Sequence, residues 1–175
     1  MKKILLVISG GIAAYKSLEL IRLFKKAGDV VKCVSTESAL TFITPASIEY
    51  LSGNPLRTSL EDREQEMNMG HIELARWPDI ILVAPATANI ISSVANGLAT
   101  DLAQTILMAT TKQMVFAPSM NVRMWENKLF QNNVAILKSN NVEFLGPTEG
   151  EMACGEFGMG RMMEPQQIVQ YLIKK

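Results

Sequence analysis

The amino-acid sequence predicts an α/β fold with a doubly wound parallel sheet, and three observations support this. Short apolar segments alternate with helical patterns along most of the chain. The apolar segments are rich in Ile, Val and Leu without polar alternation, which is typical of strands buried on both faces of a parallel sheet. The length of 175 residues suits one domain. We therefore expect a three-layer, Rossmann-like single domain spanning residues 1–175.

The strands of this sheet are predicted from the apolar segments, in chain order. They are Ile4–Ile8, Val30–Val34, Ile80–Ala84, Met114–Ala117 and Val142–Leu145. The segments between them carry helix signals, so each pair of strands forms a βαβ unit with a right-handed crossover.

Helix boundaries are predicted from capping residues and apolar spacing. The stripe formed by Leu20, Leu23, Phe24 and Ala27 ends at Gly28, a C′ glycine. Thr44-Pro45 begins the next helix as N-cap and N1, and Gly53 closes it. Further helices are expected at His71–Ala75 and at Asp101–Ala109, the second with Thr100 as its cap. Another helix is expected to end at Gly97, and one more carries the apolar stripe Phe130, Val134 and Leu137. The last helix is expected to begin at Glu164-Pro165.

Two segments do not fit this alternation. Arg57–Met69 is charged and lacks an apolar stripe, which predicts a loop or a poorly anchored helix. Gly146–Met163 contains five glycines, which predicts a long irregular loop. Such a loop inside a compact domain is usually functional or disordered.

Composition excludes several classes of protein. Seventeen basic and seventeen acidic residues give a net charge of zero, which argues against a nucleic-acid partner. No apolar segment approaches the ~20 residues that span a bilayer, so no membrane partner is expected. Two cysteines exclude a disulfide scaffold. The single histidine excludes most zinc sites, because Cys33, His71 and Cys154 show no metal-ligand spacing. We expect a protein of the reducing cytoplasm.

A glycine pair lies where the first strand turns into its helix, in Ser9-Gly10-Gly11-Ile12-Ala13. Glycines there let the backbone approach an anion, and a helix N-terminus offers free N–H groups. The motif matches neither the dinucleotide fingerprint nor a P-loop. A tight turn without a ligand explains these residues equally well.

Two short polar loops follow neighbouring strands. Thr87 and Asn89 follow the strand Ile80–Ala84, and Ser119 and Asn121 follow Met114–Ala117. The carboxyl ends of parallel strands share one edge, where ligands bind in open α/β sheets. Helix capping is the alternative for Thr87 and Asn89, but two such loops at one edge favour a bound small molecule.

Three side chains could carry chemistry. His71 lies at a loop–helix junction and is the only histidine, the residue type that serves most often as a general acid or base, so a functional role and a structural role both remain open. Cys33 lies within a strand and is expected to be an inert core residue. Cys154, in the glycine-rich segment, is a candidate acid or nucleophile, with an exposed bystander thiol as the alternative.

Taken together, the motifs resemble the homo-oligomeric flavin-containing cysteine decarboxylases over nearly the whole chain. The resemblance rests on five segments in the family's order: 9–16 (Ser-Gly-Gly-Ile-Ala-Ala-Tyr-Lys), His71–Ala75, Pro85–Asn89, Pro118–Trp125 and Gly150–Met162. It implies an FMN-binding domain and a homotrimer or dodecamer with FMN sites between subunits.

The resemblance also assigns residues. It implies that Gly10, Gly11, Ile12 and Ala13 hold the FMN phosphate, with Thr36, Thr87, Ala88, Asn89 and Ser119 as further cofactor contacts. His71, Asn121 and Cys154 match the family's catalytic residues, with Asn121 binding the substrate carboxylate and Cys154 returning a proton. The expected substrate contacts are Met120, Asn121, Ala153, Cys154 and Gly155.

The expected activity is decarboxylation of 4′-phosphopantothenoylcysteine to 4′-phosphopantetheine in coenzyme A biosynthesis. Oxidation of the cysteinyl Cβ–SH by the flavin gives a thioaldehyde, loss of CO₂ gives an enethiolate, and return of the hydride with a proton from Cys154 completes the product. A peptidyl-cysteine decarboxylase of lantibiotic maturation and a non-catalytic FMN-binding regulatory subunit are the alternatives. Many bacterial members of the resembling family continue into a phosphopantothenoylcysteine synthetase domain. We therefore expect a separate or fused synthetase as partner and no synthetase domain within these 175 residues.

Overall fold

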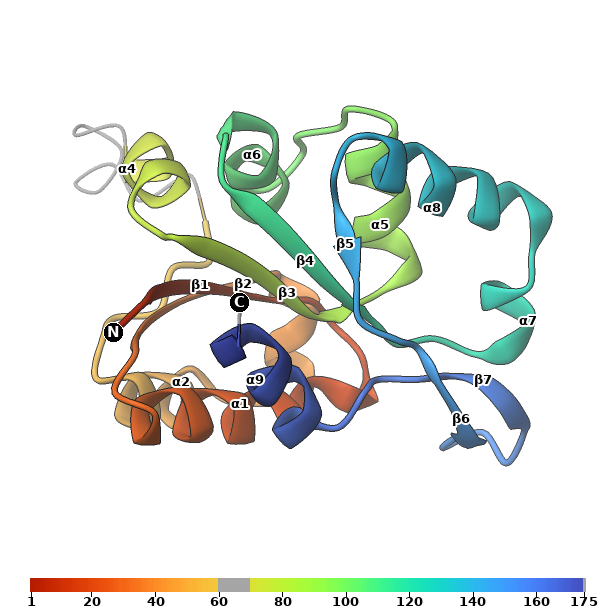
Figure 1. Cartoon of the computed structure of the whole chain (residues 1–175), viewed down its shortest axis with the longest axis horizontal. Helices are drawn as coiled ribbons and strands as arrows, with labels where there is room; N and C mark the ends of the chain where they lie inside the picture. The colour runs from red at the N-terminus through yellow and green to blue at the C-terminus, as the bar shows by residue number, and fades with distance from the viewer. Residues whose placement is uncertain (60–69, 175) are drawn as a thin grey trace.

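A computed structural model describes residues 1–59 and 70–174. Its centre is a five-stranded parallel sheet in the order β2-β1-β3-β4-β5 (Figure 1). The strands are β1 (Lys3–Ile8), β2 (Val30–Ser35), β3 (Ile80–Ala86), β4 (Gln113–Pro118) and β5 (Glu143–Phe144). Each predicted strand is present, with shifts of one or two residues at the ends. The predicted α/β architecture is confirmed.

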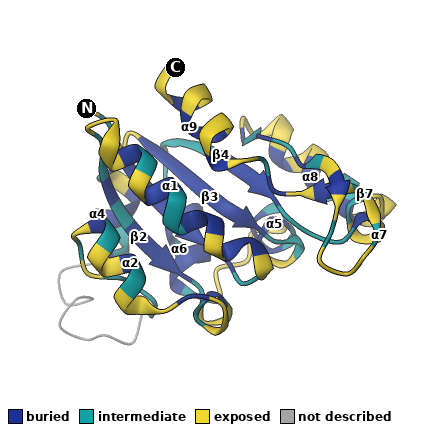
Figure 2. Cartoon of the chain, turned by 90° about the horizontal axis from the view of Figure 1, so that it is seen from below, coloured by how far each residue is buried: buried dark blue, intermediate teal, exposed yellow. Residues whose placement is uncertain are grey.

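Helices cover both faces of the sheet and give the three layers. One face carries α1 (Tyr15–Lys26), α2 (Pro45–Ser52) and α9 (Pro165–Lys174). The other carries α4 (Gly70–Arg76), α5 (Ala88–Ala95), α6 (Leu102–Ala109) and α8 (Lys128–Ser139). Short helices η1 (Ile12–Ala14), η2 (Glu37–Thr41) and α7 (Val122–Trp125) follow β1, β2 and β4. Figure 2 shows the buried strands between helices whose outer sides are exposed.

The strands divide the core into two halves by simple alternation. In β1, Ile4, Leu6 and Ile8 face α1, α2 and α9, while Leu5 and Val7 face α4, α5, α6 and α8. Successive side chains of a strand point to opposite faces. Because both faces are covered by helices, every one of these positions is apolar.

Capping residues end the helices mostly where the sequence predicts. Thr44 accepts the Ser47 N–H at 3.2 Å, and Gly53 closes α2 with φ 72°. The expectation that Thr100 caps α6 is wrong. Asp101 caps this helix, because its carboxylate accepts the Gln104 N–H at 2.7 Å. The Thr100 hydroxyl bonds to the Gln104 side chain instead.

The expectation of an irregular loop over Gly146–Met163 is also wrong where this segment forms strands. It forms an antiparallel hairpin of β6 (Thr148–Glu151) and β7 (Phe157–Arg161). A glycine is needed in this strand because a Cβ at Gly160 would lie 2.3 Å from the Met120 carbonyl oxygen. Gly160 therefore allows close backbone packing within a regular strand.

The strand order places a crevice at the carboxyl ends of β1 and β3, where the chain direction around the sheet reverses. One side chain connects the two strand ends. Ser9 donates to the Pro85 carbonyl at 2.6 Å and accepts the Thr87 N–H at 3.1 Å. The loops after β1 and β3 are thus fixed relative to each other.

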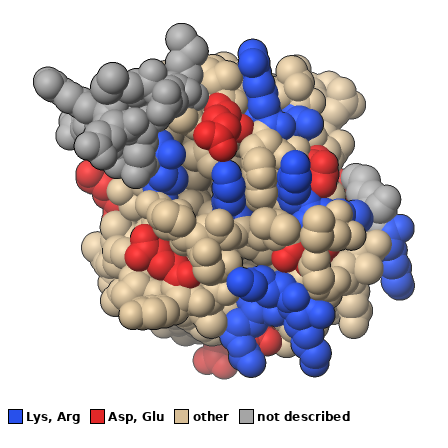
Figure 3. All heavy atoms as spheres, turned by 90° about the vertical axis from the view of Figure 1, so that its left-hand side faces the viewer, with Lys and Arg blue, Asp and Glu red and all other residues tan. Residues whose placement is uncertain are grey.

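The described part of the chain contains no helix long and apolar enough to cross a membrane. On the face shown in Figure 3, acidic and basic side chains are interspersed, in keeping with the balanced composition. Most of the charged segment Arg57–Met69 lies outside the described residues. The backbone of Arg57 itself forms an isolated parallel β-bridge with Val34 of β2.

Candidate active site

A cavity of about 870 Å³ opens at the carboxyl edge of the sheet. Its walls come from the segments that follow β1, β2, β3 and β4 and from the start of α6. The lining residues include Ser9, Gly10, Thr36, Ser38, Thr87, Ala88, Asn89, Thr100, Asp101, Gln104, Ser119 and Met120. The size lies within the roughly 300–1,000 Å³ of ligand sites. We call this space the first cavity.

The turn after β1 contains two glycines, and of these Gly10 is the one that packs closely against η2. A Cβ at Gly10 would lie 2.3 Å from Ser38 Oγ and 2.6 Å from the backbone carbon of Ser38. A Cβ at Gly11 would meet only Thr87 Cγ2, at 3.7 Å. The Ser38 hydroxyl in turn lies 3.0 Å from that of Thr36. Gly10 therefore allows two hydroxyl-bearing loops to close around one end of the cavity.

The first cavity suits a neutral ring system with an anionic tail. Its described walls carry hydroxyls, the amides of Asn89 and Gln104, helix N-termini and the carboxylates of Glu37 and Asp101, and no lysine or arginine lines it. A phosphate there would be held by backbone N–H groups and hydroxyls, which are effective anion ligands at helix N-termini. The residues present fit FMN.

A second cavity, of about 610 Å³, adjoins the first. Ser119 and Met120 belong to both walls. The second cavity is also lined by Ile12, Ala13, Tyr15, Lys16, Asn121, Glu151, Met152, Ala153, Cys154, Gly160, Arg161 and Met162. The hairpin is joined to the shared wall by a hydrogen bond of 3.0 Å from the Met120 N–H to the Gly160 carbonyl.

Asn121, Cys154 and Glu156 form a polar group at the second cavity. Asn121 caps α7 through its Oδ1, which leaves its Nδ2 to donate to Cys154 Sγ at 3.3 Å and to Glu156 Oε2. The Cys154 thiol lies 3.7 Å from the same carboxylate oxygen, and Arg123 Nε lies 3.5 Å from Glu156 Oε1. The Asn121 hydrogen bond, helped by Arg123 and Cys154, holds the pKa of Glu156 below its ordinary value.

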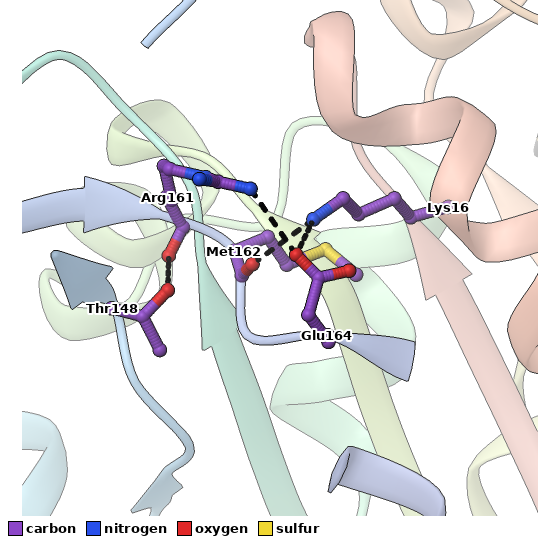
Figure 4. A network of polar contacts seen from close by, with 5 residues as sticks. All are labelled: Lys16, Thr148, Arg161, Met162 and Glu164. Carbon is purple, nitrogen blue, oxygen red and sulfur yellow. Dashed lines mark hydrogen bonds and ion pairs between the residues drawn. The ribbon is translucent and has the colours of Figure 1, made fainter. Parts of the chain in front are cut away.

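A charged group lies at another part of the second cavity, where α1 meets the end of the hairpin (Figure 4). Lys16 Nζ lies 2.7 Å from Glu164 Oε1 and donates to the Met162 carbonyl at 3.4 Å. Arg161 Nη2 lies 3.3 Å from the same Glu164 oxygen. Two cations therefore share one carboxylate.

The structure brings together most of the predicted site residues. Of the predicted cofactor contacts, Gly10, Thr36, Thr87, Ala88, Asn89 and Ser119 line the first cavity, while Ile12 and Ala13 line the second. Of the predicted substrate contacts, Met120, Asn121, Ala153 and Cys154 line the second cavity. Gly11 and Gly155 lie beside these walls in sequence without forming them. Thr87 caps α5 and also lines the first cavity, so both of the roles considered for it from the sequence are present in the structure.

His71 lies apart from this group. It is the second residue of α4, half-buried, and it is absent from the walls of both described cavities. Within a single chain, His71 therefore does not lie beside Asn121 and Cys154. Cys33 is buried in β2, and burial raises the pKa of its thiol to about 12, which fits an inert core residue.

Among the residues that the structure places at or beside these cavities, sequence reasoning gave no role to Lys16, Ser38, Glu156 and Arg161. A signal existed for Lys16, which stands four residues before Leu20 and so on the buried stripe of its helix. No local pattern identifies Glu156 or Arg161, because their positions depend on the hairpin register.

Comparison with known proteins identifies the family. The Flavoprotein family model matches residues 1–175. The coenzyme A biosynthesis bifunctional protein CoaBC of Vibrio vulnificus is 49% identical over 168 residues, which are 96% of this chain and 42% of that protein. CoaBC of Escherichia coli K12 is 45% identical over 172 residues, 98% of this chain and 42% of that protein. The chain thus spans less than half the length of these relatives.

Two solved structures share the fold. A PPC decarboxylase mutant complexed with pantothenoylaminoethenethiol is 31% identical, with a TM-score of 0.88 over 99% of this chain and 97% of that chain. The FMN binding protein AtHal3 is also 31% identical, with a TM-score of 0.85 over 99% and 95% of the two chains. With the family model covering every residue, the chain belongs to the Flavoprotein family.

Proposed function

We propose that the protein is an FMN-dependent decarboxylase that converts 4′-phosphopantothenoylcysteine to 4′-phosphopantetheine in coenzyme A biosynthesis. The observation that carries this proposal is the contact of Asn121 with Cys154 at a cavity that shares a wall with the first cavity. A cofactor in one cavity and a substrate in the other would meet at Ser119 and Met120. The relatives named for coenzyme A biosynthesis and the PPC decarboxylase structure support the same activity.

FMN would be held by the turn at Gly10, the hydroxyls of Thr36 and Ser38, and the segment Thr87–Asn89. Bound FMN supplies a two-electron acceptor that takes a hydride from the substrate's Cβ–SH carbon and later returns it. The protein orients the substrate so that this carbon faces the shared wall, and it manages the charges and protons.

Asn121 would hold the substrate carboxylate through its Nδ2. This donor already binds a carboxylate in the protein, that of Glu156, so its geometry suits such a ligand. Loss of CO₂ from the oxidised substrate leaves an enethiolate, whose negative charge is delocalised onto sulfur. Cys154, exposed beside Asn121, would then supply the proton that accompanies the returned hydride.

We further propose that His71 acts as base or orienting group from a neighbouring subunit of a homotrimer, alone or within a dodecamer. Its distance in the fold from both cavities of its own chain supports a site completed between subunits. The protein would act in the cytoplasm, with a phosphopantothenoylcysteine synthetase, fused or separate, supplying its substrate.

The test is turnover by the purified protein loaded with FMN. Incubation with 4′-phosphopantothenoylcysteine should release CO₂ and form 4′-phosphopantetheine in equal amounts. A protein that binds no FMN, or that binds FMN and leaves this substrate unchanged, would refute the proposal. Mixing His71→Asn and Cys154→Ser chains tests the subunit arrangement, because mixed trimers should regain part of the activity that each variant lacks.

A further inference from the structure

The proposed substrate carries two anionic groups, and the site described so far accounts for one. Asn121 is assigned to the carboxylate, while the phosphate lacks a partner. A phosphate monoester carries up to two negative charges at neutral pH. Its site needs cations or several N–H donors in reach of the same cavity.

We propose that Lys16 and Arg161 form the binding site for the substrate's phosphate monoester. Both line the second cavity, the one that also contains Asn121 and Cys154. They come from different elements, since Lys16 is in the first turn of α1 and Arg161 ends β7. This inference rests on the proposed function and adds the group that selects the phosphorylated substrate.

The charges of this group leave an unbalanced cation. Lys16 and Arg161 contact a single carboxylate oxygen, Glu164 Oε1, at 2.7 and 3.3 Å (Figure 4). Two positive charges against one negative charge leave a surplus of one positive charge. Among the described residues, Glu164 is the one hydrogen-bond partner of the Arg161 guanidinium, which has five N–H donors in all. Donors therefore remain for a ligand.

Lys16 is also held in place as a binding group would be. Its side chain is only 11% exposed, and its ammonium is fixed by Glu164 and by the Met162 carbonyl. Burial of a lysine is costly unless it is paired, and fixed pairing reduces the entropy lost on ligand binding. The lysine is thus preorganised at the cavity wall.

The backbone of the hairpin leaves room for Arg161. A Cβ at Gly150, on the opposite strand of the hairpin, would lie 2.7 Å from both Cδ and Nη1 of Arg161. The Arg161 guanidinium therefore packs against the backbone of Gly150, where no side chain intervenes. Glu151 is the acidic residue that lines the same cavity, and it is exposed. Its charge can turn to solvent, whereas Glu164 is tied to both cations.

The test compares two substrates that differ only in the phosphate, 4′-phosphopantothenoylcysteine and pantothenoylcysteine. The FMN-loaded wild-type protein should prefer the phosphorylated substrate in kcat/KM. Lys16→Gln should lower this preference by about 10- to 100-fold, through KM, which corresponds to about 1.4–2.8 kcal/mol. Arg161→Gln should lower it less, because that side chain is 42% exposed. For both variants, kcat/KM should fall far less for pantothenoylcysteine than for 4′-phosphopantothenoylcysteine, because pantothenoylcysteine presents no phosphate to Lys16 or Arg161.

Lys26→Gln is the matched control, since it removes the same charge from the exposed side of the same helix and Lys26 lines neither cavity. Its substrate preference should equal that of the wild type. If Lys16→Gln lowers kcat/KM equally for both substrates, its role is structural and the inference is overturned. If the wild type turns over both substrates equally well, no phosphate site exists although the decarboxylase proposal stands. If it turns over neither, the proposed function itself fails.

Discussion

Replacement of Gly10 by alanine should destabilise the protein and weaken FMN binding, while the same change at Gly11 should do neither. The new methyl group at position 10 would lie 2.6 Å from the backbone carbon of Ser38, 0.8 Å short of the 3.4 Å at which ordinary contact begins. Rotation of the Ser38 side chain cannot relieve a contact with backbone, so η2 has to move. Gly11 has an extended backbone with φ −178°, and a Cβ there would meet only Thr87 Cγ2, at an ordinary contact distance of 3.7 Å.

The expected cost of such overpacking is about 1–3 kcal/mol. For a chain of this length this corresponds to a fall in Tm of about 2–12 °C. Because Ser38 and Thr36 line the first cavity, the shift of η2 should also lower FMN occupancy, measured as flavin absorbance per chain after gel filtration. Melting is measured on FMN-stripped protein, so that lost ligand stabilisation does not add to the packing cost. Equal Tm values for Gly10→Ala and Gly11→Ala would refute this reasoning.

Three further predictions concern the connection of the strand ends and the polar group at the second cavity. Ser9→Ala should lower the free energy of unfolding, measured in urea, by about 1–3 kcal/mol. The buried Ser9 hydroxyl donates to the Pro85 carbonyl and accepts the Thr87 N–H, so its removal takes the partner from both groups. A change below about 0.5 kcal/mol would contradict this prediction. Cys154→Ser should still release CO₂ but accumulate a product two hydrogens short of 4′-phosphopantetheine by mass, and normal product from this variant would exclude the thiol as proton donor. Glu156 has a lowered pKa in the folded protein, so its contribution to stability is present above its ordinary value of 4.5 and is lost as pH falls through the lower folded value. Glu156→Gln should therefore flatten the pH dependence of unfolding below pH 4.5, and an unchanged slope would show that the Asn121 contact contributes nothing.

The architecture could be predicted because it depends on signals within each segment. Unbroken apolar runs such as Ile4–Ile8 occur where helices cover both faces of a sheet. Both ends of α2 could be predicted from local sequence, because Thr44 caps the helix through a hydrogen bond three residues away and Gly53 ends it through its left-handed backbone conformation. The misplaced cap of α6 has a local cause too, because Thr100 and Asp101 are both good caps and only the geometry of Gln104 decides between them.

The hairpin and the charged contacts could not be predicted in the same way. Glycine counts suggested irregularity, whereas Gly160 is needed for a contact with Met120, forty residues away in sequence. The pairing of Lys16 with Glu164 spans 148 positions and depends on how α1 and α9 pack on the same face of the sheet. Motif resemblance gave roles to Asn121 and Cys154 but none to Glu156, although Glu156 lies within the matching segment Gly150–Met162.

The wall formed by Ser119 and Met120 has a consequence for how this protein can diverge. Both cavities are bounded by the same two residues, and the Met120 backbone is also joined to Gly160 of the hairpin. A substitution there reshapes two binding spaces at once. A lineage that altered this dipeptide to admit a new substrate would disturb the neighbouring cavity in the same step. Drift in specificity is therefore expected first at residues that line the second cavity and not the first, such as Arg161 and Ala153.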